Sequence, residues 1–160
     1  KVFYPLAYYC AYYSIRANAF DYEKMAMGRE RLEYYINDYK AKKADGTISN
    51  VEDDELKDMR IVQEMYARGF EFVPIDIYKA KARSFQIIDG KIMPSFKVIS
   101  KVGESAGESI EIAARDGEFL SKDDLRQRAR IGQTVIEKLG ELGLLDGMAE
   151  SNQLSLFDVI

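Results

Sequence analysis

The feature that most constrains this chain is an internal repeat between Pro94 and Leu145. At an offset of 29 residues, apolar residues fall on apolar residues and a glycine falls on a glycine. The pairs are Phe96 with Leu125, Val102 with Ile131, Gly103 with Gly132, Ala106 with Val135, Ile110 with Leu139 and Ala113 with Leu142. Apolar residues three or four apart on both sides of a glycine predict a helix, a tight left-handed turn and a second helix. The repeat therefore predicts two successive helical hairpins.

Polar residues follow the same repeat, because Lys101 pairs with Arg130 and Ser105 with Thr134. A helix that begins directly after a tight turn leaves backbone N–H groups unpaired at the positive end of its dipole, where a phosphate oxygen can bind. A cation before the turn and a hydroxyl after it add donors at the same point. This is the arrangement of the helix-hairpin-helix motif, which binds nucleic-acid backbone without reading bases. Two hairpins that only pack on each other are the alternative, and the shared polar residues favour DNA binding.

The second copy should bind the backbone more strongly than the first. Between residues 120 and 145 five basic residues stand against four acidic ones, whereas between residues 97 and 119 three stand against five. Neutralised phosphates supply most non-specific affinity for DNA, so the copy with more basic residues should bind DNA more tightly. The predicted DNA-backbone contacts are Lys101, Val102, Gly103, Ser105, Lys122, Arg126, Arg130, Ile131, Gly132, Gln133 and Thr134.

Composition excludes several classes of site. The 160 residues include no histidine and one cysteine, so internal disulfides, Cys/His zinc sites and Ser-His or Cys-His nucleophiles are excluded. The net charge of −4 is unusual for a free-standing DNA-binding protein, so the DNA contact must be local or assisted by a larger protein. No apolar run approaches membrane-spanning length, which predicts no membrane partner. The chain begins without methionine inside an aromatic run, which we interpret as a fragment of a longer protein.

The first half predicts a mainly helical subdomain. Helices are expected over Pro5–Ala19, from the cap Asp21 through Tyr39 with an end in the solvated run Lys40 to Lys43, and from about Val51 to Gly69. The spacing of the tyrosines in the first of these helices favours core packing over a base-stacking platform; they are Tyr4, Tyr8, Tyr9, Tyr12 and Tyr13.

A small β-hairpin should follow over residues 85–93, with Asp89-Gly90 as its two-residue turn. Residues 70–77 contain Pro74 and are expected to form an edge strand or an extended connector. In the repeat, Ser121 should cap a helix with Leu120 packed on Leu125, and Gly143 should end the last helix. The fold class is therefore mainly α with a small β-hairpin, divided into a helical subdomain (1–93), tandem helix-hairpin-helix motifs (94–145) and a flexible tail (146–160).

The tail contains a short apolar motif, QLSLF, made of Gln153, Leu154, Ser155, Leu156 and Phe157. Burying its three large apolar side chains in a partner would contribute a gross ~5–9 kcal/mol. Ordering the tail offsets part of this, which leaves an affinity on the order of micromolar. From residue types alone, docking of the tail on its own domain is the favoured interpretation.

QLSLF closely resembles the sliding-clamp-binding motif of bacterial replication proteins. The rest of the chain resembles the C-terminal end of the PolC-type alpha subunit of bacterial DNA polymerase III. The segments that carry this resemblance are FYPLAYYCAYYSIRA (3–17), ARGFEF before Val73, Pro94-Ser95-Phe96, GEFLSKDDLRQR (117–128) and SNQLSLFD (151–158).

The resemblance implies that residues 2–93 are the last part of the fingers region, that the hairpins hold the duplex leaving the active site, and that the tail binds the clamp, the beta subunit. The usual Gly-x-Gly of each hairpin appears here as Lys101-Val102-Gly103 and Arg130-Ile131-Gly132. The implied partners are double-stranded DNA, the clamp and the rest of the polymerase chain. The implied location is the bacterial cytoplasm, associated with the nucleoid.

The parent enzyme that the resemblance implies is a DNA-directed DNA polymerase, a nucleotidyltransferase that also carries a 3'-5' exonuclease domain. Its palm uses paired aspartates and Mg²⁺. These residues contain no Asp-x-Asp, so we expect no catalytic residue, metal site or cofactor in the fragment, and no activity from it alone. The alternative is a protein-interaction module of the replisome that does not contact DNA.

Overall fold

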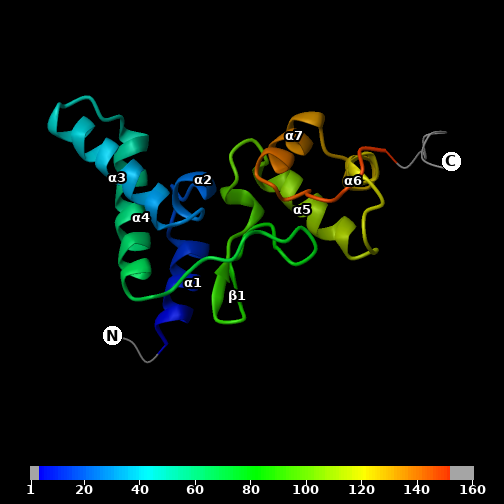
Figure 1. Cartoon of the computed structure of the whole chain (residues 1–160), viewed down its shortest axis with the longest axis horizontal. Helices are drawn as coiled ribbons and strands as arrows, with labels where there is room; N and C mark the ends of the chain where they lie inside the picture. The colour runs from blue at the N-terminus through cyan, green and yellow to red at the C-terminus, as the bar shows by residue number, and fades with distance from the viewer. Residues whose placement is uncertain (1–3, 152–160) are drawn as a thin grey trace.

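Apolar residues recur every three or four positions along most of the chain, and its computed structural model, which describes residues 4–151, is accordingly mainly helical (Figure 1). The elements are α1 (Pro5–Ile15), α2 (Tyr22–Met25), α3 (Arg29–Ala44), α4 (Asn50–Ala67), β1 (Gln86–Ile88), β2 (Lys91–Met93), the 3-10 helix η1 (Phe96–Val98), α5 (Gly103–Ala114), α6 (Lys122–Ala129) and α7 (Gln133–Glu141). The predicted fold class is confirmed. Within the described range, no helix is both long and apolar enough to cross a bilayer.

Helices α3 and α4 pack together and extend away from the rest of the chain (Figure 1). Helix α4 begins at a capping box in which Ser49 and Glu52 satisfy each other's backbone N–H groups. Its buried face carries Leu56, Met59 and Val62, as their helical spacing predicts. After α4 ends, Gly69 adopts a φ of +86° and redirects the chain.

The helix predicted from Asp21 through Tyr39 is in fact two helices. Asp21 caps α2 as expected, since its carboxylate accepts the Lys24 N–H at 3.1 Å. However, α2 ends at Met25, and Gly28 then adopts a φ of +107° before α3 begins. A side chain is strongly disfavoured at this φ, so glycine permits a turn that the apolar periodicity conceals. The first helix also ends earlier than predicted, at Ile15.

The tyrosines of α1 and its N-cap residue Tyr4 divide between the core and the surface. Tyr9 and Tyr13 are buried, and the Tyr13 ring lies 5.3–5.6 Å from the rings of Phe20, Phe72 and Phe85. The core interpretation is correct for these two. Tyr4 and Tyr8 are 79% and 47% exposed, so for them it is wrong, because no other part of the described chain covers that face of α1.

The predicted β-hairpin is confirmed and joins the two halves of the chain. Strands β1 and β2 pair with Gln86 opposite Met93, and both turn residues have positive φ, as a type I′ turn requires. The connector before it pairs with β2 through an isolated bridge between Phe72 and Ile92. The hairpin is held to α1 by the Phe85 N–H, which donates to Ser14 Oγ at 2.9 Å.

A single hydrophobic core runs through both halves, and α2 lies where they meet. The Tyr22 hydroxyl accepts the Ile75 N–H at 3.3 Å, and Glu23 forms an ion pair with Lys138 of α7. Lys24 binds Glu55 at 2.9 Å and therefore holds α2 to α4. The second helical hairpin is thus fixed to the first half of the chain by a four-residue helix.

Candidate nucleic-acid interface

The two copies of the repeat fold into two helical hairpins. The first consists of η1, a turn and α5, and the second consists of α6, a turn and α7. Repeat partners occupy equivalent buried positions, because Phe96, Leu125, Ile110 and Leu139 all have no exposed surface. The repeat therefore reports a packing pattern that each hairpin uses in the same way.

The turns place a basic residue in the left-handed conformation. Lys101 has a φ of +70° and Arg130 a φ of +54°. Gly103 also has a positive φ, +74°, as predicted. In the second turn the prediction is wrong, because Gly132 is extended (φ −79°, ψ 165°) and Arg130 takes the left-handed position instead. A non-glycine residue costs roughly 1–2 kcal/mol in this region, so each turn holds its cation against a conformational preference.

Most predicted contact residues lie on the surface, whereas Val102 and Ile131 are buried and anchor the turns. Val102 and Ile131 are 4% and 8% exposed, so their side chains anchor the turns in the core and only their backbone faces outward. The exposed predicted residues in and after the turns are Lys101, Gly103, Ser105, Arg130, Gly132, Gln133 and Thr134. Within residues 4–151, the side chains of Lys101 and Arg130 form no ion pair or hydrogen bond. Both cations are therefore available to a ligand.

The helices that follow the turns begin without side-chain caps. Helices α2, α4 and α6 are each capped by a side chain, from Asp21, Ser49 and Ser121 respectively. Helices α5 and α7 have no such cap. Their first-turn N–H groups are thus left for water or an anion, beside an exposed cation in each case.

The two turns differ in nearby negative charge. Glu104 and Glu108 lie in the first part of α5, and Arg83 pairs with both, at 2.7 Å from Glu108. One cation thus balances two carboxylates next to the first turn. The first turn of α7 carries no acidic residue. This difference favours the second hairpin for an anionic ligand. Sequence reasoning missed the role of Arg83, because it lies in a loop whose position depends on the tertiary fold.

Several basic residues of the second copy have structural partners. Lys138 is 8% exposed and pairs with Glu23, and Lys122 pairs with Glu150 at 2.7 Å. Arg128 donates to three main-chain carbonyls between α5 and α6. Arg126, a predicted contact, is exposed, and its guanidinium lies 3.9 Å from the Asp123 carboxylate. The charge count therefore overstates how much of this copy is free to bind phosphate.

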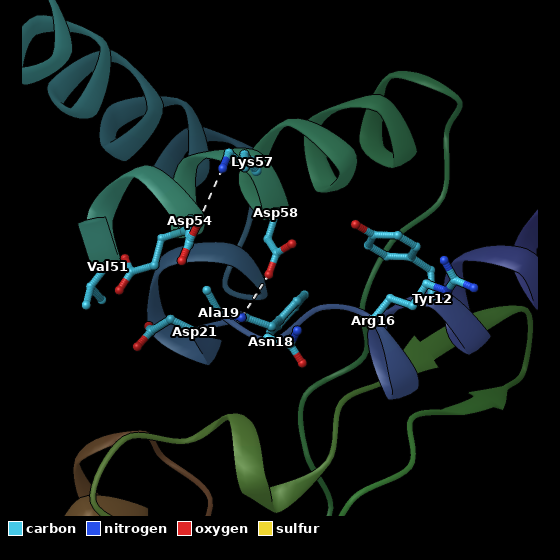
Figure 2. A pocket seen from close by; sticks show the side chains of 11 residues that line it. Tyr12, Arg16, Asn18, Ala19, Asp21, Val51, Asp54, Lys57 and Asp58 are labelled. Atoms are coloured by element: carbon cyan, nitrogen blue, oxygen red, sulfur yellow. Dashed lines mark hydrogen bonds and ion pairs between the residues drawn. The ribbon is translucent and has the colours of Figure 1, made fainter. Parts of the chain in front are cut away.

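A pocket of about 560 Å³ lies between the end of α1, α2 and α4, and Figure 2 shows that several carboxylates line it. Each has a partner in the fold. Asp58 accepts the Ala19 N–H at 3.0 Å, Asp54 pairs with Lys57 at 3.4 Å, and Asp21 caps α2. Burial raises the pKa of Asp58 and of Asp21. These contacts give the pocket's carboxylates structural roles, and across residues 4–151 no group of three or more His, Cys, Asp or Glu is placed to hold a metal ion.

The predicted clamp-binding residues, Gln153 to Phe157, lie outside the described residues. The segment just before them, which the sequence assigned to the tail, contacts the second hairpin. The Lys122 N–H donates to the Ala149 carbonyl at 2.8 Å, and the Asp123 N–H donates to the Glu150 carbonyl at 3.1 Å.

Comparison with known proteins supports the resemblance drawn from the motifs. The chain is 44% identical over 158 residues to the DNA polymerase III PolC-type of Streptococcus suis (strain 98HAH33). It is 43% identical to that of Streptococcus pyogenes serotype M2 and 42% identical to that of Streptococcus pneumoniae serotype 2 (strain D39 / NCTC 7466). Each match covers 99% of this chain and 11% of the relative, so the chain spans about one ninth of the length of these curated relatives.

The helix-hairpin-helix motif profile matches residues 69–154, which is more than half of the chain and includes both hairpins. Within this range the structure forms two hairpins with equivalent buried residues and with a left-handed residue in the same position of each turn. The chain belongs to the helix-hairpin-helix family.

Proposed function

We propose that this chain is a non-catalytic part of a PolC-type replicative DNA polymerase whose two hairpins bind the backbone of duplex DNA. The observation that carries the proposal is the matched geometry of the turns. In each, an exposed left-handed cation lies two or three residues before the start of a helix whose N-terminus has no side-chain cap. The similarity to PolC-type polymerases over 99% of the chain supplies the context of replication.

Each hairpin binds one stretch of sugar-phosphate backbone. The buried side chains of Val102 and Ile131 fix the turns, so the N–H groups that follow them keep a constant direction. A phosphate oxygen accepts from these N–H groups, and Lys101 or Arg130 balances its charge. No base edge is involved, so binding is independent of sequence and sensitive to salt.

The chemistry of the whole enzyme lies elsewhere in this proposal. Polymerisation and 3'-5' exonuclease activity belong to other domains of the parent protein, and its Mg²⁺ belongs to the palm. Residues 4–151 offer no comparable set of metal ligands. The chain alone is inactive, its other partner is the rest of the polymerase, and the assembly works in the bacterial cytoplasm at the nucleoid.

The second proposed contact is with the sliding clamp. Its support is the likeness of Gln153 to Phe157 to the clamp-binding motif of bacterial replication proteins. A linear motif with three large apolar side chains gives an affinity on the order of micromolar, which holds the enzyme near its template and allows release. A peptide covering residues 151–158 should bind a bacterial clamp, and Phe157→Ala should abolish this binding. Equal binding by the substituted peptide would remove clamp binding from the proposed function.

Fluorescence anisotropy of a labelled duplex, measured over a series of salt concentrations, tests the DNA contact. Arg130→Glu should weaken binding, and the slope of log K against log salt should fall by about 0.9 for each phosphate that the variant no longer neutralises. Lys40→Glu is the matched control, because Lys40 is exposed on α3, away from both turns. Binding that does not change with salt, or an equal loss of affinity in both variants, would contradict the proposal.

The second candidate function is a replisome protein-interaction module that does not contact DNA. It is supported by the net charge of −4 and by the carboxylates beside the first turn, because negative charge repels phosphate. Nuclease footprinting with the intact polymerase separates the two. If the hairpins bind DNA, Lys101→Glu and Arg130→Glu shorten the protected duplex. An unchanged footprint would favour the interaction module.

A further inference from the structure

A groove of about 780 Å³ separates the connector before the β-hairpin from the segment that follows α7. We call it the C-terminal groove; its apolar lining includes Tyr78, Phe119, Leu120, Leu144 and Met148, and carboxylates such as that of Asp146 also line it. Its volume lies within the roughly 300–1,000 Å³ that is typical of sites for small ligands and peptide side chains.

The groove leaves large apolar side chains open to solvent. Leu120 is 73% exposed and Tyr78 is 42% exposed. The sequence predicts that Leu120 packs on Leu125, but Leu125 is fully buried while Leu120 points away from the core. Exposed apolar residues that line one groove are a feature of binding surfaces.

The C-terminal segment is fixed at the edge of this groove. Figure 1 shows the chain after α7 crossing back toward α6. There the carbonyls of Ala149 and Glu150 accept N–H groups from Lys122 and Asp123, and Glu150 pairs with the Lys122 side chain. The tail therefore starts beside Leu120, only two residues from Lys122. Residues 152–157 can span up to about 20 Å, which is enough to enter the groove.

We propose that Leu154, Leu156 and Phe157 pack into the C-terminal groove of their own chain when no partner is bound. Residues 152–160 carry a single charged side chain, Asp158, so little of the tail's own charge is desolvated when it docks. A tethered segment also has an effective concentration on the order of millimolar, which an untethered partner must exceed. The groove thus holds the three apolar side chains that the clamp is proposed to bind.

Competition with the clamp follows, and this part rests on the proposed function. If the groove holds the tail with an intrinsic Kd of ~0.1 mM at an effective concentration of ~1 mM, the tail is free about one tenth of the time. The apparent affinity for a clamp is then reduced about tenfold, because only the free tail is competent to bind. The groove would act as an internal competitor that keeps the motif from non-specific apolar contacts.

Methyl NMR spectra of the 160-residue chain, with and without residues 152–160, test the docking directly. Removing these residues should shift the methyl resonances of Leu120, Leu144 and Met148 and leave those of α1 and α3 unchanged. Unchanged resonances in the groove would overturn the proposal. The truncation removes nothing from the described fold, so loss of folding does not confuse the result.

A fluorescence experiment gives an independent reading, because the chain contains no tryptophan. With Phe157→Trp the only indole is in the tail, and its emission should be blue-shifted and poorly quenched by iodide. Adding Leu120→Glu should return the emission to that of a solvent-exposed indole, while Ile15→Glu on the exposed face of α1 should not. A blue shift that requires high protein concentration and accompanies dimer formation would assign the groove to a second copy and overturn docking within one chain.

Titration with a purified bacterial clamp separates the inference from the proposed function. Leu120→Glu should strengthen clamp binding about tenfold, since it releases the tail. A chain whose tail docks in the groove but never binds a clamp would keep this inference and refute the proposed clamp contact. A chain that binds the clamp equally well with and without Leu120→Glu would refute the competition.

Discussion

The guanidinium of Arg128 lies over the ring of Phe119, with its central carbon 4.5 Å from the ring centroid. From this position it donates to the carbonyls of Ala113, Gly117 and Glu118, at 2.9 to 3.1 Å. Arg128 belongs to the second hairpin, whereas these carbonyls belong to the end of the first and the link that follows it. One side chain therefore sets how the two hairpins connect.

Replacing Arg128 should cost stability through geometry and not only through charge. Arg128→Lys keeps the cation but loses the planar donor fork, so it should lower the free energy of unfolding by about 2–3 kcal/mol. Urea denaturation measures this. Arg115→Lys is the control, because Arg115 is 70% exposed and pairs loosely with Glu111 at 3.8 Å. Equal stability of the two variants would show that the carbonyl contacts of Arg128 contribute nothing.

Two helical glycines should respond in opposite directions to alanine. A Cβ at Gly107 would lie 2.8 Å from the Phe96 Cβ, where α5 crosses η1, whereas a Cβ at Gly140 has no atom within 4 Å. Gly107→Ala should therefore destabilise the chain by roughly 1–3 kcal/mol through overpacking. Gly140→Ala should stabilise it by about 0.5–1 kcal/mol through helix propensity. Thermal unfolding of both variants checks this, and a stabilising Gly107→Ala would refute the close contact.

Stability and DNA binding should separate at Arg130. Glycine relieves the left-handed strain of roughly 1–2 kcal/mol but costs about 0.5–1 kcal/mol in chain entropy, so Arg130→Gly should be neutral or stabilise by up to ~1 kcal/mol. The same change removes the cation and should weaken duplex binding. Arg130→Ala should lose the same affinity without any gain in stability. Unfolding experiments and anisotropy titrations on the same samples measure the stability and the DNA affinity of both variants. Full DNA affinity in the glycine variant would exclude Arg130 from the contact.

Asp58 should make stability fall as pH rises. Burial raises the pKa of the Asp58 carboxyl above its ordinary value of 3.8. Between pH 3.8 and the raised pKa, the folded chain therefore binds more protons than the unfolded chain. Stability is therefore highest below pH 3.8 with respect to this group and declines through the raised pKa. Asp58→Asn keeps an acceptor for the Ala19 N–H without the charge, so it should raise the free energy of unfolding at pH 7.

The gain from Asp58→Asn should vanish near pH 3, where the parent carboxyl is protonated in both states. Urea denaturation at several pH values measures the difference between the two chains. Asp116→Asn serves as the control, because Asp116 is exposed after α5. A loss of stability in Asp58→Asn at pH 7 would mean that the ionised carboxylate is favoured in the fold.

Local signals in the sequence were sufficient for much of this fold. The Asp89-Gly90 turn, the caps at Asp21 and Ser121 and the offset of 29 residues each depend on a few neighbouring residues, and the structure confirms them. The break at Gly28 was missed, because apolar periodicity continues across it and only a positive φ reveals it.

The features that the sequence did not predict depend mostly on long-range contacts. The charge count treated Lys138 and Arg128 as surface cations, whereas one pairs with Glu23 and the other binds the link between the hairpins. No local pattern marks either contact, since their partners lie far away in sequence or are main-chain carbonyls. In the candidate site, the positions of the turns could be predicted, but the left-handed conformation of Arg130 could not, because a positive φ is typical of glycine and not of arginine.

The outward face of α1 has a practical consequence for any work on the isolated polypeptide. Tyr4, Tyr8 and Ile15 form an exposed apolar strip on one side of this helix. Within residues 4–151 no other segment covers it. Such a strip promotes self-association as concentration rises. Sedimentation at the concentrations used for binding should therefore accompany every titration, and Ile15→Glu offers a more soluble form in which the hairpins and their turns are untouched.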